Sequence, residues 1–194
     1  SAGRYFIRPS YLEESSPRGA IVLTIDASTA FGSGDHGTTR GCLLALDNIA
    51  KESRIKHPLD LGCGSGILAL AMARTWRRPV VASDIDEEAI RVTNENARIN
   101  DVADLVKTHC SAGFNVAVTA EGPYDLVVAN ILLGPLVNMA DDIACHLTTG
   151  GIAIMSGILG YQEKDLRPAY VAAGLQFISR FELDGWHTLV LSKT

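Results

Sequence analysis

The sequence predicts a doubly wound α/β fold, in which a mostly parallel β-sheet carries helices on both faces. Short apolar runs alternate with longer amphipathic stretches, which is typical of repeated βαβ units. A glycine-rich turn at residues 62–66 lies between a short apolar run and a helical pattern. With 194 residues, the chain is long enough for one domain with a substantial core and short for two.

Three strands are predicted where apolar runs are nearly unbroken, as expected for strands that helices cover on both sides. They span residues 79–83, 124–129 and 151–156. Near the C-terminus, residues 175–179 and 186–191 predict an antiparallel pair joined by a turn at residues 184–185. The sheet is therefore expected to be parallel in its centre and antiparallel at one edge.

Helices are predicted where apolar residues recur at helical spacing. One follows the glycine turn at residues 67–73, and another spans residues 87–99. A third covers residues 136–147, and Gly150 and Gly151 predict its end. We expect residues 1–20 to form an N-terminal arm and residues 21–194 to form the catalytic domain.

Composition excludes several classes of function. The net charge is −5 with scattered Lys and Arg residues, so direct nucleic-acid binding is not expected. The four cysteines (Cys42, Cys63, Cys110 and Cys145) are far apart, which predicts reduced thiols in a cytoplasmic protein. The histidines form no metal-ligand pattern, and the N-terminal residues form no signal or membrane segment, so neither a metal nor a membrane partner is expected.

The glycine-rich turn is the strongest local motif. Asp60 is followed by Gly62, Gly64 and Gly66 at alternate positions, just before an apolar helix. Glycines let the backbone approach a ligand closely, and the helix N-terminus offers free N–H groups. A dinucleotide fingerprint would need glycine at position 67, where the chain has Ile67, so the spacing favours a methyl donor over NAD. The alternative is a plain glycine turn.

Two polar residues follow predicted strands at the edge where such folds bind ligands. Asp84 follows the strand at 79–83 and is the candidate clamp for ribose hydroxyls, with Ile85 beside it and Asp86 as a helix N-cap. Asn130 follows the strand at 124–129 and is the candidate catalytic residue, because an amide can orient an incoming amine. An ordinary asparagine at a turn is the alternative.

A second glycine-dense segment, residues 30–40, precedes a predicted helix that contains Cys42, Leu43, Leu46 and Ile49. This segment could fold over a ligand. Its composition fits equally well a plain loop in which Asp35 or Thr38 caps the helix.

Five segments together resemble one family in the same order: residues 30–39, 60–66, 83–86, 128–132 and 156–159. The chain resembles the ribosomal-protein methyltransferases of PrmA type, which methylate large-subunit protein eleven. The resemblance implies a seven-stranded class I fold and S-adenosylmethionine as cofactor, with S-adenosylhomocysteine as product. It also implies a ribosomal protein substrate that is methylated on lysine side chains and an N-terminal α-amine.

The resemblance assigns roles to individual residues. Thr39, Gly62, Asp84 and Asn130 fall on the family's cofactor-contact positions, and Phe31 lies in the loop expected beside the donor. The chain departs from the family pattern at residues 26–29 and at Asp35 and Gly37, and these departures concern the loop's substrate contacts and not its cofactor role. No segment has the length of the family's N-terminal substrate-recognition domain, which we expect to be absent.

Other activities share this fold and donor. A class I methyltransferase could instead act on a glutamine amide, a nucleic acid or a small molecule. The sequence at residues 130–133 lacks the Pro-Pro-aromatic pattern typical of enzymes that methylate amides or bases. A non-catalytic module that binds S-adenosylmethionine is the alternative from another class.

Overall fold

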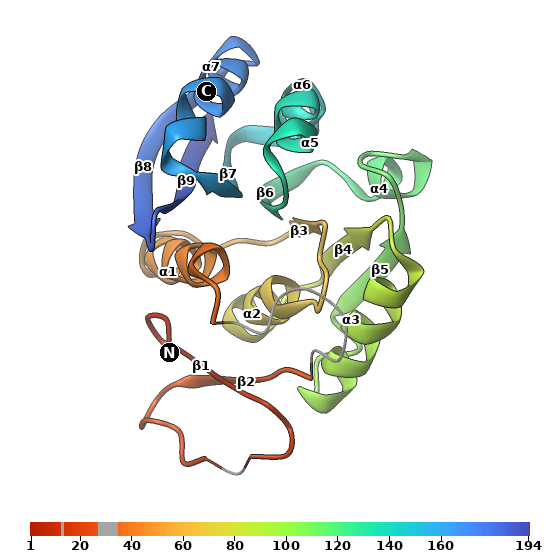
Figure 1. The fold of residues 1–194 in the computed structure, drawn as a ribbon. Coiled ribbons are helices and arrows are strands. Elements are labelled where there is room, and N and C mark those ends of the chain that lie inside the picture. Colours follow the sequence, from red (N-terminus) through yellow and green to blue (C-terminus); the bar gives the residue numbers. More distant parts are fainter. Residues whose placement is uncertain (13, 27–34) are drawn as a thin grey trace.

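The computed structural model describes residues 1–12, 14–26 and 35–194. Within these residues, seven strands form one sheet in the order β5-β4-β3-β6-β7-β9-β8, and helices cover both of its faces (Figure 1). The predicted doubly wound α/β class, with the seven-stranded sheet that the resemblance implied, is confirmed.

Strands β5, β4, β3, β6 and β7 pair in parallel, and β9 pairs antiparallel with both β7 and β8. The strands are β3 (Pro58–Leu61), β4 (Val80–Asp84), β5 (Val106–Cys110), β6 (Tyr124–Asn130), β7 (Leu147–Leu159), β8 (Leu175–Leu183) and β9 (Trp186–Lys193). The predicted C-terminal pair is thus confirmed, with its turn at residues 184–185.

The helices divide between the two faces of the sheet (Figure 1). One face carries α1 (Gly37–Glu52), α2 (Ile67–Trp76) and α3 (Glu87–Ile99). The other face carries α4 (Val116–Glu121), α5 (Leu133–Asn138), α6 (Ala140–His146) and α7 (Glu163–Ala172). The 3₁₀ turn η1 (Gly160–Gln162) directly precedes α7. Successive residues of a strand serve opposite cores: Val128 packs with α1 and α2, and Val127 packs with α5 and α6. This double burial explains why the central strands are apolar throughout.

The order of the strands creates a crevice at one edge of the sheet. The chain builds outward from β3 to β4 and β5, then returns to place β6 and β7 on the other side of β3. The loops after β3 and β6 therefore diverge, and ligands of such folds bind at this switch point.

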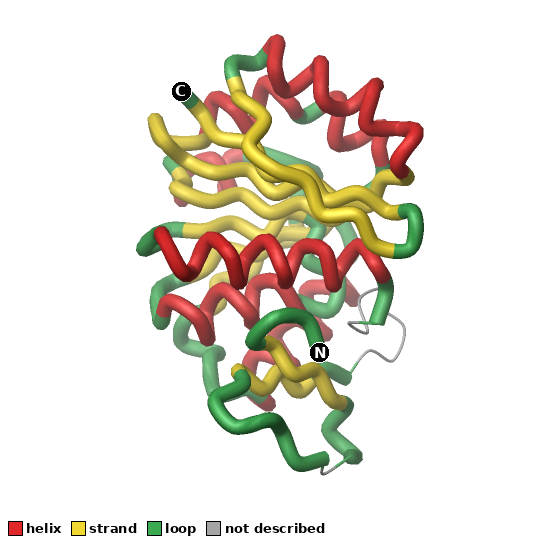
Figure 2. Tube along the Cα trace, turned by 90° about the vertical axis from the view of Figure 1, so that its left-hand side faces the viewer, coloured by secondary structure: helices red, strands yellow, loops and turns green. Residues whose placement is uncertain are grey.

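The N-terminal segment forms a second, small sheet. Strands β1 (Tyr5–Arg8) and β2 (Ile21–Thr24) pair in parallel. Figure 2 shows this pair beyond the helix layer, on the side away from the main sheet. Tyr5 is fully buried, and its hydroxyl lies 2.7 Å from Thr75 Oγ1 on α2. The division into an arm at 1–20 and a domain at 21–194 stays a prediction.

The predicted helix at residues 136–147 is helical over most of its length, but it is not continuous and it ends one residue earlier. The structure has two short helices that meet at Met139, and Leu147 begins β7. Gly150 and Gly151 lie inside this strand, where the register with β6 shifts, because Tyr124 pairs with Leu147 but Leu126 pairs with Ile152. Glycine marks a strand irregularity as well as a helix end, and here the first applies.

Candidate active site

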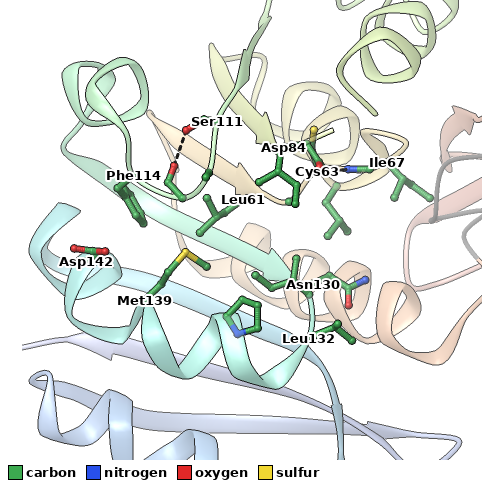
Figure 3. Close-up of a pocket in the computed structure, with 18 of the residues that line it drawn as sticks. Leu61, Cys63, Ile67, Asp84, Ser111, Phe114, Asn130, Leu132, Met139 and Asp142 are labelled. Atoms are coloured by element: carbon green, nitrogen blue, oxygen red, sulfur yellow. Dashed lines mark hydrogen bonds between the residues drawn. The ribbon is translucent and has the colours of Figure 1, made fainter. Parts of the chain in front are cut away.

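A cavity of about 630 Å³ opens at the carboxyl edge of the sheet. Its walls come from the loops that follow β3, β4, β5 and β6, and from α1, α2, α5 and α6. Figure 3 shows Cys63 and Asp84 on one wall and Asn130 and Leu132 on the opposite one. The volume lies in the range of small-molecule sites.

The glycine turn is held tightly against its neighbours. Gly62 has φ +76°, and a Cβ on it would lie 2.4 Å from Ile131 Cγ2. Its N–H donates to Ser83 O at 2.7 Å. Gly66 has φ +80° and is the N-cap residue of α2. Gly62 and Gly64 line the cavity, whereas Gly66 lies behind them and is not part of the wall.

Asp84 lies on the cavity wall with both carboxylate oxygens fixed by backbone groups. Gly64 N–H donates to Oδ2 at 2.9 Å, and Asp86 N–H donates to Oδ1 at 3.1 Å. A carboxylate accepts about four hydrogen bonds, so it retains capacity for a ligand's hydroxyls. Ile85 also lines the cavity and is 74% exposed, which leaves an apolar surface free beside the carboxylate. Asp86 accepts from Glu88 N–H at 2.9 Å, so the predicted N-cap is confirmed.

Asn130 and Thr39 meet at the other wall. Asn130 Nδ2 donates to Thr39 Oγ1 at 3.4 Å, although the two residues are 91 positions apart in the chain. Thr39 is buried in the first turn of α1. Asn130 Oδ1 is buried and has no hydrogen-bond partner among the described residues. A buried amide oxygen without a partner is unusual and is expected to accept a bond from a ligand.

The start of α1 differs from the prediction. His36 is the N-cap residue, and its ring accepts a hydrogen bond from Thr38 N–H, so neither Asp35 nor Thr38 caps the helix. The centroid of the imidazole also lies 4.9 Å from that of the Trp186 ring, which brings β9 next to α1.

Phe31 lies outside the described residues. In the part of the chain that the structure describes, no group of three or more His, Cys, Asp or Glu residues is arranged to hold a metal.

Asp60 lies beneath the glycine turn and is not part of the cavity wall. It is 1% exposed; its Oδ2 accepts from Ala69 N–H at 2.8 Å, and its Oδ1 has no partner within the described ranges. Burial raises the pKa of Asp60 to about 7, and the charge of Asp84 acts in the same direction. The Ala69 N–H opposes this rise.

Replacing Asp60 by Asn is expected to flatten the pH dependence of stability. The unfolded chain releases this proton near pH 4, whereas the folded chain holds it to about pH 7, so the free energy of unfolding falls as pH rises between the two values. A difference of one pKa unit corresponds to about 1.4 kcal/mol. Between about pH 5 and about pH 8, we therefore expect the free energy of unfolding to fall by about 2–3 kcal/mol less in Asp60→Asn than in the unaltered chain. Urea unfolding of both proteins at each pH measures this, and parallel pH profiles would contradict it.

One part of the cavity was not predicted from the sequence. Residues 111–114, after β5, form a wall at the end away from Asn130. Ser111 Oγ donates to Gly113 O at 2.9 Å, the bond drawn as a dashed line at Ser111 in Figure 3. The Phe114 ring stacks on the His146 ring, with centroids 4.4 Å apart. Strand β5 reads Val-Lys-Thr-His-Cys and has no apolar run, so the site that follows it lacked a marker.

The segment from α5 to α6 supplies further wall residues that were not predicted from the sequence: Pro135 on α5, Met139 between the two helices, and Asp142 on α6.

A family model described as "Ribosomal protein L11 methyltransferase (PrmA)" matches residues 1–194. The chain is 43% identical over 192 residues to a ribosomal protein L11 methyltransferase of Caulobacter sp. (strain K31), a match that covers 99% of this chain and 66% of the relative. The chain thus spans just under two thirds of the length of that relative.

Solved structures show similar folds. The crystal structure of ribosomal protein L11 methylase from Lactobacillus delbrueckii subsp. bulgaricus superposes with a TM-score of 0.88 at 26% identity, over 98% of this chain and 95% of that chain. An RNA methyltransferase from Salinibacter ruber in complex with S-adenosyl-L-homocysteine has a TM-score of 0.57 at 18% identity, over 77% of this chain and 86% of that chain. The second likeness shows the fold alone.

Proposed function

The chain belongs to the PrmA family of ribosomal protein L11 methyltransferases, and from this premise we propose that it transfers methyl groups from S-adenosylmethionine to amino groups of that ribosomal protein. The family predicted from the sequence motifs is confirmed. A ribosomal protein substrate would place the activity in the cytoplasm.

The observation that carries the proposal is the pairing of two polar groups across one cavity. Asp84 and Asn130 lie at the ends of strands β4 and β6, and both line the cavity. The first offers a carboxylate whose position is fixed by backbone N–H groups, and the second offers a buried amide oxygen that has no partner in the described part of the chain. The Asp84 carboxylate suits the hydroxyl groups of a methyl donor, and the Asn130 amide oxygen suits an N–H group of the incoming amine.

The residues of the cavity fit S-adenosylmethionine. Gly62 and Gly64 leave room for a ligand close to the backbone, and Asp84 can accept from both ribose hydroxyls. The exposed Ile85 side chain offers an apolar contact for a flat ring. When bound, this cofactor supplies an electrophilic methyl group on a sulfonium.

Catalysis in this site would rest mainly on positioning. A free lysine amine has a pKa of about 10.4 and must lose a proton before it can attack. Transfer from water into a partly buried site lowers the pKa of an amine and favours its neutral form. Asn130 Oδ1 can accept one N–H of that amine and hold its lone pair toward the methyl group, while Thr39 holds the amide.

A titration with S-adenosylhomocysteine tests the donor half of this proposal. We expect saturable binding of S-adenosylhomocysteine and no binding of NAD at the same concentration, because Ile67 occupies the position where a dinucleotide site needs glycine and is 3% exposed. Isothermal calorimetry measures both. Binding of NAD, or no heat with S-adenosylhomocysteine, would show that the cavity has another ligand.

A further inference from the structure

Three polar side chains along one side of α3 are buried, two in the helix and one at its C-cap. Thr93, Asn96 and Asn100 are 0%, 1% and 4% exposed, and their spacing places them along a single stripe of the helix. A buried face of a helix is normally apolar. Polar groups in such a position need partners, and the partners of this stripe show what it holds.

The first two side chains of the stripe contact the glycine turn from behind. Thr93 Oγ1 donates to Gly64 O at 3.0 Å, and Asn96 Nδ2 donates to Ser65 O at 2.9 Å. A Cβ on Gly66 would lie 2.8 Å from Thr93 Cγ2, so the turn is packed directly on the helix. Neither Thr93 nor Asn96 lines the cavity.

The stripe also binds the end of β2, which α3 approaches at its C-terminal end (Figure 1). Asn100 Oδ1 accepts from Thr24 N–H at 2.8 Å, and its Nδ2 donates to Thr24 O at 2.7 Å. Asn96 Oδ1 accepts from Asp26 N–H at 3.0 Å. Asn96 therefore contacts both the glycine turn and the segment that follows β2, whereas the Asn100 side chain bonds to β2 and to its own helix.

These bonds fix the orientation of the turn's peptide groups. Because a peptide unit is planar, a carbonyl that is held in place also fixes the N–H of the next residue. Thr93 and Asn96 thus orient the amides that follow Gly64 and Ser65. The amide of Gly64 itself donates to Asp84 Oδ2, so the turn is held by α3 on one side and by the proposed ribose clamp on the other.

We propose that Thr93 and Asn96 are positioning residues for donor binding, which hold the glycine turn in its binding conformation before the donor arrives. This inference rests on the proposed function, because it assumes that the cavity takes S-adenosylmethionine. A site that is already ordered does not lose binding energy to ordering a loop. Without these bonds, the turn must be ordered by the ligand, and affinity falls.

The first test compares Asn96→Ala with the matched control Asn100→Ala. Both changes remove a buried amide from the same helix face, so both are expected to lower the melting temperature. Only Asn96→Ala is expected to raise the Kd for S-adenosylhomocysteine, by about tenfold, while the control stays within about twofold. Calorimetry is done well below both melting temperatures, so that unfolding does not contribute.

A second pair of variants keeps the test decisive if Asn96→Ala does not fold. Thr93→Val keeps the shape of the side chain and removes the hydroxyl that donates to Gly64 O, whereas Thr93→Ser keeps the hydroxyl. We expect Thr93→Val to raise the Kd severalfold and Thr93→Ser to restore it. In methyl transfer, KM for the donor should rise in Thr93→Val while kcat at saturating donor is unchanged.

The outcomes separate the two proposals. If the unaltered chain does not bind S-adenosylhomocysteine, the proposed function fails and this inference fails with it. If the unaltered chain binds and Thr93→Val binds equally well, the inference alone is overturned. An equal rise in Kd for Asn96→Ala and Asn100→Ala would also overturn it, because general loosening of α3 would then explain the loss.

Discussion

Replacing Asn130 by Ala is expected to slow methyl transfer about a hundredfold at saturating donor, with little loss of donor affinity. The amide lies across the cavity from Asp84, and it donates its hydrogen bond to Thr39. Its role in the proposed reaction is to orient the incoming amine, so its loss should lower the rate of the methyl-transfer step. Single-turnover rates, set beside separately measured donor affinities, test this expectation.

Thr39→Val is the matched control for this variant. It removes the hydroxyl that accepts from Asn130 Nδ2 but leaves Asn130 Oδ1 in place, so a smaller loss of rate is expected. Equal losses of rate and donor affinity in Asn130→Ala would count against an orienting role and would instead make Asn130 part of the donor site.

The Asp84→Ala variant should bind S-adenosylhomocysteine about ten- to hundredfold more weakly, because a hydrogen bond to a charged group contributes about 1.5–3 kcal/mol. The carboxylate is held toward the cavity by the amides of Gly64 and Asp86, so its loss removes a fixed acceptor. The domain should remain folded, because Asp84 is the last residue of β4 and is not part of the buried core. Calorimetry and thermal unfolding measure the two properties.

Asp86→Ala provides the control, because Asp86 caps α3 and does not line the cavity. We expect it to lower the free energy of unfolding by about 0.5–2 kcal/mol and to leave donor affinity within about twofold. If Asp84→Ala also binds within twofold of the unaltered chain, the assignment of Asp84 to the ribose is wrong.

The parts of the fold that were predicted correctly are those with a local sequence marker. Strands β4, β6 and β7 are buried on both faces, so apolar runs revealed them. The glycine turn was predicted because its backbone conformation and close packing require glycine at Gly62 and Gly66. Strand β5 combines polar and apolar residues, and for that reason the cavity wall after it was missed.

The remaining features depend on contacts between distant segments. The helix predicted over residues 136–147 fitted the spacing of its apolar residues, but Leu147 pairs with Tyr124 in the sheet instead. Asn96 and Asn100 are polar residues that the helical pattern gives no reason to bury, and their hydrogen-bond partners include Asp26 and Thr24. No periodicity within the helix carries that information, because the partners lie about seventy positions away.

Mass spectrometry of ribosomal proteins, after incubation with S-adenosylmethionine and this chain, tests the methyl transfer itself. We expect mass increases of one or more methyl groups on lysine side chains or the N-terminal amine of the ribosomal protein that the family methylates. We expect no such increase when the Asn130→Ala variant is used for the same time. Methyl groups found on ribosomal RNA, or on no ribosomal protein although the chain binds the donor, would contradict the proposed function.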